Sequence, residues 1–162
     1  MKRVEANDPI AISEMGSKVI EEGDLESAFE YYTKAAALGD ANSHYQLSIF
    51  HRDGLGGVEK DEKKRLHHTE QAAIGGHPRA RHNLGCIEAR VNRMDRAGKH
   101  FIIAAKLGFD MSLDYVKKLH KDGHVSKEDF GAALRGYQAA IAATKSPQRD
   151  VAYEFFDSLE EE

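Results

Sequence analysis

The chain contains a single cysteine, Cys86, and this scarcity limits the chemistry open to its 162 residues. One cysteine can form neither an intrachain disulfide nor a multi-cysteine zinc site, and such usage favours a reducing compartment. No apolar run approaches the roughly 20 residues of a membrane span, and the opening MKRVEANDPIAIS lacks the apolar stretch of a signal peptide. We therefore expect a cytoplasmic or nuclear protein with no membrane partner, and not a secreted one.

A strong excess of charge is also absent. The formal net charge is −4, and the aromatic content of 8% is ordinary. Basic residues do gather between Lys60 and Arg81, but acidic residues such as Glu62 and Glu70 are interleaved with them. A nucleic-acid footprint needs a net positive face with stacking or groove-reading elements. The composition thus predicts a solvated helix surface here and no nucleic-acid partner.

Proline is rare and alternating apolar patterns are nearly missing, which argues against a sheet. Stretches rich in Ala, Glu, Lys and Leu are separated by glycines, a pattern typical of short helices. Apolar residues recur at helical spacing, as in Tyr32, Ala35 and Ala36, and again in Phe101, Ala104 and Ala105. We predict an all-α fold.

A junction pattern repeats along the chain, as in AAIGGHPRARHNLG at residues 72–85. Its second alanine recurs at intervals of 37, 32 and 35 residues, a period typical of stacked helical arrays. The positions of this marker are Ala36, Ala73, Ala105 and Ala140. In the first three copies a glycine follows the marker by three residues (Gly39, Gly76, Gly108). The residue eight positions before the marker is alanine in three copies (Ala28, Ala97, Ala132) and Arg65 in the second. Small residues at that position allow a neighbouring helix to approach closely.

These marks predict one domain over residues 1–162, built of four helix-turn-helix repeats at about 7–40, 41–77, 78–109 and 110–145. First helices are expected at about 9–22, 41–52, 78–91 and 111–121, and second helices at 24–38, 61–74, 94–107 and 127–143. Ser146-Pro147 starts a C-terminal capping helix, 146–160. Asn7 stands where the other copies have glycine, so MKRVEAN resembles the tail of an earlier helix, and we expect the natural protein to extend upstream.

The second copy, ANSHYQLSIFHRDGLGGVEKDEKKRLHHTEQAAIGGHP, resembles the Sel-1-like repeat of the tetratricopeptide-related superfamily. The matching positions are Leu47, Ser48, Gly54, Gly56, Val58, Asp61, Ala72, Ala73 and Gly76. It departs from the pattern at His51, at Arg65 in place of alanine, at His68 in place of a large aromatic residue, and at the extra Gly57. The segments HPRARHNLGCIE and HFIIAAKLG of the third copy are most similar to repeat arrays of microalgae. The resemblance implies a right-handed αα-superhelix.

Such an array offers a concave face to a protein or peptide, so we expect a non-enzymatic scaffold or adaptor, monomeric and without cofactor or metal. Groove positions carried over from the tetratricopeptide arrangement give a predicted binding set. Its members are Ser13, Ser17, Asn42, Tyr45, Arg52, Arg79, His82, Arg90, Asp114 and Lys118.

Two alternatives stay open at this stage. One is a metal-binding protein or enzyme that uses His44, His51, His82 and Cys86, although no carboxylate completes a ligand set at the right spacing. The other is a structural spacer of a larger protein. A phosphate loop at residues 54–57 is disfavoured, because GLGG lacks the following Gly-Lys and leaves a helix rather than a strand.

Overall fold

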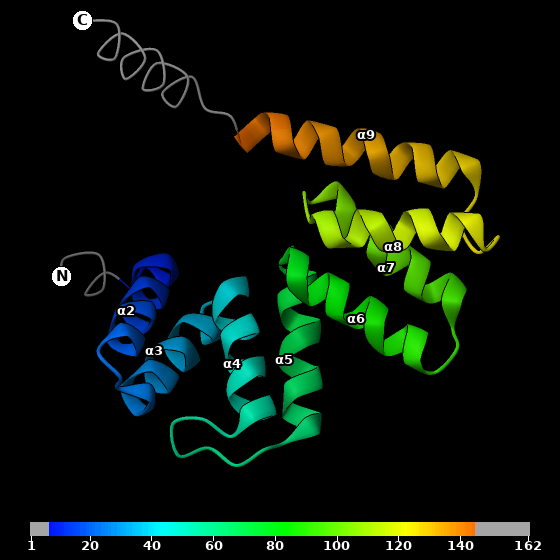
Figure 1. Ribbon diagram of the computed structural model, residues 1–162. Helices are drawn as coiled ribbons and strands as arrows, with labels where there is room; N and C mark the ends of the chain where they lie inside the picture. Colours follow the sequence, from blue (N-terminus) through cyan, green and yellow to red (C-terminus); the bar gives the residue numbers. More distant parts are fainter. Residues whose placement is uncertain (1–6, 145–162) are drawn as a thin grey trace, which may run out of the picture.

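The computed structural model describes residues 7–144, and within that range every regular element is an α-helix. The helices form four consecutive antiparallel pairs (Figure 1). The first helices of the pairs are α2 (Pro9–Glu21), α4 (Ala41–Asp53), α6 (Pro78–Arg90) and α8 (Asp110–Lys121). The second helices are α3 (Leu25–Ala37), α5 (Glu62–Ile74), α7 (Met94–Lys106) and α9 (Lys127–Thr144).

The predicted helices are confirmed, each boundary lying within one residue of the observed one. The predicted capping helix at 146–160 lies outside the described residues. In Figure 1 the helices change direction midway: α4 and α5 stand upright, whereas α8 and α9 lie across the view, with α6 between them. None of the described helices combines the length and apolar character that a membrane crossing requires.

Aspartates start many of these helices. Asp24, Asp40 and Asp61 precede α3, α4 and α5, and each side chain accepts a hydrogen bond from a backbone N–H of the first turn at 2.7–3.0 Å. Before α6, the Nδ1 atom of His77 accepts the corresponding bond from Ala80. Such caps satisfy donors that the helix itself leaves unpaired, and each typically contributes about 1 kcal/mol.

A residue in the left-handed region follows the second helices, as the repeat predicts. Gly39, Gly76 and Gly108 have φ between 85° and 88°, a conformation that costs glycine little. Asn7 has φ 53°, which confirms its equivalence to these glycines. The chain therefore makes the same turn at the start of each pair.

Within a pair, a glycine of the first helix lies against an aromatic ring of the second. A Cβ atom on Gly16 would be 2.9 Å from the ring of Tyr32, and one on Gly85 would be 2.7 Å from the ring of Phe101. Both distances are shorter than ordinary carbon contacts. The two helices can approach this closely only because the glycine has no side chain.

Between pairs, the small residue eight positions before the marker allows the next first helix to approach. Ala28 is fully buried in a cluster with Leu47 and Phe50 of α4. Ala97 is likewise fully buried, in a cluster with Val116 and Leu119 of α8. The same geometry thus recurs at the first and third junctions of the array.

The last copy is shifted by one residue from the sequence prediction. Ala133 rather than Ala132 is fully buried, so the marker of this copy is Ile141 and not Ala140. With this register Tyr137 occupies the position of Tyr32 and Phe101, and it packs on the same core cluster as Phe101. The prediction was wrong because no glycine ends this helix where the other copies have one.

The Gly-x-Gly-Val loop between α4 and α5 is a structural turn. Gly56 has φ 60°, and a Cβ there would lie 2.6 Å from the carbonyl oxygen of Leu25. The loop therefore packs back on the start of α3. This contact explains the loop without any phosphate ligand.

Replacing Gly85 with alanine tests the glycine contact within a pair. We expect Gly85→Ala to lower the free energy of unfolding by about 1–3 kcal/mol, because Phe101 must move out of its packed position. Urea denaturation followed by circular dichroism measures the change. Gly131→Ala is the matched control on α9, where the added methyl meets only the flexible end of Arg135, and it should raise stability by about 0.5–1 kcal/mol. Equal effects of the two substitutions would contradict the packing argument.

Candidate functional site

Two of the predicted groove residues are buried and hold first helices together. Ser13 is 5% exposed, and its hydroxyl accepts a hydrogen bond from the Asn42 amide at 3.2 Å, which joins α2 to α4. His82 is 6% exposed, and its Nδ1 lies 2.8 Å from the Ser112 hydroxyl, which joins α6 to α8. The expectation that Ser13 and His82 are displayed on the surface is therefore corrected: both serve packing.

The other predicted positions reach the surface to different degrees. Tyr45 is half-buried and stacks on His77 at 4.2 Å between ring centroids, which links α4 to the start of α6. The Ser17 hydroxyl lies 3.0 Å from that of Tyr32, although Ser17 itself is exposed. The remaining exposed members are Asn42, Arg52, Arg79, Arg90, Asp114 and Lys118. Partner binding by these residues stays a prediction.

The structure brings two of these residues into one pocket, of about 340 Å³, between α4, α5 and α6. It is lined by Arg52, Glu62, Arg65, Asn83, Cys86, Ile87 and Arg90. Asn83, Ile87 and Arg90 follow one face of α6 at spacings of four and three residues. The sequence prediction included Arg52 and Arg90 separately, but it missed Arg65 and Asn83 as their neighbours.

The charges in this pocket are unbalanced. Arg65 donates from Nε to Glu62 at 2.6 Å and from a terminal nitrogen to the other Glu62 oxygen, and its side chain is only 15% exposed. This bond, together with the nearby charge of Arg90, lowers the pKa of Glu62. The lining therefore carries three guanidinium groups against one ionised carboxylate.

The pocket lies where the sequence departs from the repeat pattern. Arg65 occupies the position that Ala28 and Ala97 hold at the other junctions, eight residues before the marker. At this middle junction the buried apolar cluster consists of three alanines, with Tyr45 and Leu84 beside them. A large charged side chain thus replaces a methyl group at the contact with α6, and polar atoms line the space beside it.

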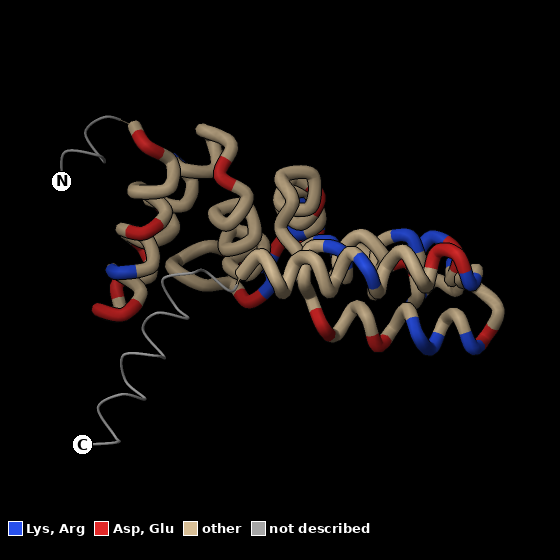
Figure 2. The backbone as a smooth tube through the Cα atoms, turned by 90° about the horizontal axis from the view of Figure 1, so that it is seen from above, with Lys and Arg blue, Asp and Glu red and all other residues tan. Residues whose placement is uncertain are grey.

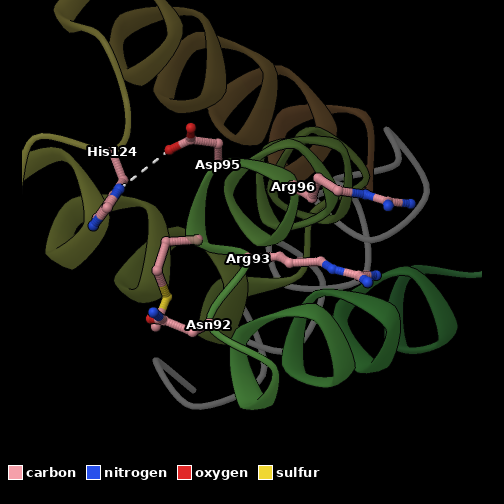
Figure 3. A pocket seen from close by; sticks show the side chains of 6 residues that line it. Asn92, Arg93, Asp95, Arg96 and His124 are labelled. Atoms are coloured by element: carbon pink, nitrogen blue, oxygen red, sulfur yellow. Dashed lines mark hydrogen bonds and ion pairs between the residues drawn. The ribbon is translucent and has the colours of Figure 1, made fainter.

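A second depression, of about 330 Å³, lies at the turn between α6 and α7 (Figure 3). Asp95 pairs there with His124 at 3.1 Å, while Arg93 and Arg96 point away from that pair. Both arginines are paired instead with Glu88, at 3.5 and 3.1 Å. The charged groups of this depression therefore do not converge on a common point.

Histidines gather between α4 and α5. The Nδ1 atoms of His44 and His68 are 3.0 Å apart, and the ring of His51 stacks on that of His68 at 5.6 Å. Two imidazole nitrogens can share a hydrogen bond only when one of them is unprotonated. Burial, followed by the neighbouring histidines, lowers the pKa of His68 to about 4. Among residues 7–144, no three His, Cys, Asp or Glu side chains are arranged to hold a metal ion.

His82 and Cys86 form a separate contact on α6. The His82 Nε2 lies 3.4 Å from the Cys86 sulfur, and the imidazole is enclosed by Phe101, Phe109 and Tyr115. Burial raises the pKa of the Cys86 thiol and lowers the pKa of His82. Both shifts favour the neutral pair over the thiolate and imidazolium that a cysteine nucleophile requires.

The histidine cluster makes stability depend on pH in a predictable direction. The unfolded chain protonates His68 near its ordinary pKa of 6.5, whereas the folded chain takes up this proton only near pH 4. The unfolded state therefore binds more protons between these values, and the free energy of unfolding should fall as the pH drops from about 6.5 to about 4. The charge of Lys64 acts in the same direction.

Urea denaturation across this pH range, on the parent chain and on His68→Phe, measures the effect. The variant should lose a large part of the pH dependence, and the remainder should come from His44 and His51, whose pKa values burial also lowers. His124→Gln removes an exposed histidine and is the matched control. A His68→Phe variant with the parent's full pH dependence would contradict the cluster's role.

The stacked antiparallel pairs, with recurring small residues at their contacts, define an all-α helical-repeat solenoid. A model of the Sel1 repeat matches residues 11–40 and 41–77, the first two of these pairs. This match identifies residues 11–77 as two Sel1 repeats, and proteins with such repeats typically mediate protein–protein interactions. The division of the remaining residues into two further repeats and the likeness to microalgal arrays stay predictions.

Similar proteins come from a plant and from bacteria. The chain is 35% identical over 68 residues to the ERAD-associated E3 ubiquitin-protein ligase component HRD3A of Arabidopsis thaliana, covering 42% of this chain and 10% of that protein. A Sel1 repeat protein from Oxalobacter formigenes superposes with a TM-score of 0.67 at 23% identity, covering 90% of this chain and 62% of the other. A protective antigen of uropathogenic Escherichia coli with an SLR fold gives 0.64 at 23% identity, with 83% and 31% covered.

Proposed function

We propose that the chain is a non-enzymatic scaffold that binds a partner protein or peptide on the concave face lined by its first helices. The observation that carries this proposal is the lateral linkage of those helices. Ser13 bonds Asn42, Tyr45 stacks on His77, and His82 bonds Ser112. These contacts fix α2, α4, α6 and α8 in sequence, and a fixed row of helices is a preorganised binding surface.

Charge gives this surface its expected selectivity. Figure 2 shows acidic positions prevailing over α2 to α4, whereas basic positions are frequent along α5 to α8. Arg79, Arg90 and Lys118 are exposed on the later first helices. We propose that a partner's acidic segment lies along α6 and α8, since complementary charge steers association and fixes register.

Several other features support the scaffold role. Sel1-repeat scaffolds are generally non-catalytic, and the plant relative is, by its name, a component of an ERAD-associated E3 ubiquitin-protein ligase. The pKa shifts of the half-buried Cys86 and the buried His82 favour their neutral forms, which are unsuited to nucleophilic chemistry. We further propose that the protein is monomeric and cytoplasmic, with the nucleus as the alternative location.

Site-specific photo-crosslinking tests the concave face. A crosslinking amino acid is placed at Arg79 on α6 or, as the matched control, at Lys99 on the second helix α7, both of which are exposed. We expect the Arg79 position to give a discrete covalent partner in extracts of the natural host, and the Lys99 position to give at most a tenth of that yield. Arg79→Glu in the unmodified chain should weaken co-purification of the same partner.

Equal crosslinking from both positions, or none from either, would contradict the proposed face. Circular dichroism of each variant establishes that the helices persist. Elemental analysis of the untagged protein separates this proposal from a metal-dependent enzyme, because stoichiometric metal would favour the latter.

A further inference from the structure

We infer that the pocket formed by Arg52, Arg65 and Arg90 binds a carboxylate side chain, an aspartate or glutamate, of the partner. This inference rests on the proposed scaffold function and names the chemistry of one contact within it. The pocket lies between the first helices α4 and α6 and has a volume of about 340 Å³. That space accommodates an acidic side chain together with its neighbouring backbone.

The arginines have different roles in this site. Arg65 is committed to Glu62 by two hydrogen bonds, so this pair forms a fixed wall rather than a free donor. Arg52 uses its Nε and one terminal nitrogen on Asp53, at 2.9 and 2.7 Å, which leaves its other terminal nitrogen available to a ligand. Among residues 7–144, no ion pair engages Arg90, although Arg90 lies near enough to lower the pKa of Glu62.

Arg90 and Arg52 therefore supply the charge for a ligand, and Asn83 adds an amide donor on the same face of α6. A planar guanidinium matches a carboxylate in a bidentate arrangement, and a bond between charged groups is about twice as strong as a neutral one. Both arginines lie on first helices and belong to the predicted binding set. A single acidic residue could thus anchor a peptide across two neighbouring pairs.

The pocket favours a carboxylate over a phosphate group. Glu62 stays ionised beside Arg65 and Arg90, and Asp53 stays ionised beside Arg52, so the three guanidinium groups face two carboxylates. Arg52 is paired with Asp53 and Arg65 with Glu62, so the positive charge of Arg90 is the one left uncompensated in this group. One uncompensated charge matches a singly charged carboxylate better than a phosphate dianion. We therefore commit to an aspartate or glutamate of a protein partner.

The sequence also departs from the repeat pattern at this site, because Arg65 stands where the first and third copies have alanine. An alanine at position 65 would reproduce the tight contact that Ala28 and Ala97 make at the other junctions. Arg65 instead places a long charged side chain at this junction and orients Glu62, which lines the pocket on one side. The residue that breaks the packing pattern is thus also the one that shapes the site.

Peptide display on the immobilised 162-residue chain tests this assignment. A library of random 12-residue peptides is selected, and the affinity of each enriched peptide is measured by fluorescence polarisation. We expect enrichment of Asp or Glu at one position, and we expect Arg90→Ala or replacement of that acidic residue by its amide to weaken binding at least tenfold. Arg52→Ala should weaken it a few-fold, and Lys121→Ala, an exposed cation of α8, should leave it unchanged.

A double-mutant cycle gives the decisive readout. Arg90→Ala combined with the amide-substituted peptide should cost no more than either change alone, because both remove the same contact. A version of the peptide with phosphoserine at the acidic position should bind more weakly, and tighter binding of it would overturn the carboxylate assignment. Enriched peptides that are indifferent to Arg90 would also overturn the inference, while leaving the scaffold proposal intact. Failure to enrich any acidic peptide would overturn it too, and the crosslinking experiment then decides the scaffold proposal on its own.

Discussion

Close contact between helices that carry small side chains is the constraint on which the rest of the structure depends. Gly16 against Tyr32 and Gly85 against Phe101 set the spacing within pairs, and Ala28 and Ala97 set it between pairs. Because interiors are close-packed, a methyl group more or less at these contacts changes the distance between helices. The path of the array follows from a few positions that recur about every 35 residues.

The second junction is the exception, and its chemistry differs accordingly. Arg65 replaces the buried alanine, and the buried apolar cluster there is reduced to three alanines. Histidines fill the adjoining space between α4 and α5. A polar junction between two apolar ones provides charged side chains at the middle of the first-helix surface, and the histidines beside it make stability depend on pH. The replacement of alanine by Arg65 thus accounts both for the charged side chains at this junction and for its small apolar cluster.

Much of the fold was accessible from the sequence, because its determinants are local. The alanine pairs, the glycine after Ala36 and its equivalent Asn7 predict the helices to within one residue. The site was less accessible. Ser13 and His82 are buried through bonds to Asn42 and Ser112, about 30 residues further along the chain in the next pair, and the local sequence pattern does not reveal such contacts. Arg65 was visible as a departure from alanine, but its grouping with Arg52 and Arg90 depends on three helices and emerges only in space.

The central claim is that the side chain at position 65 determines how far α6 stands from α5. A crystal structure of Arg65→Ala measures this most directly, since alanine restores the residue found at the first and third junctions. The account predicts that α6 moves toward α5 and that the pocket beside it contracts well below its present 340 Å³. An unchanged helix spacing, with a pocket enlarged by the missing side chain, would contradict it.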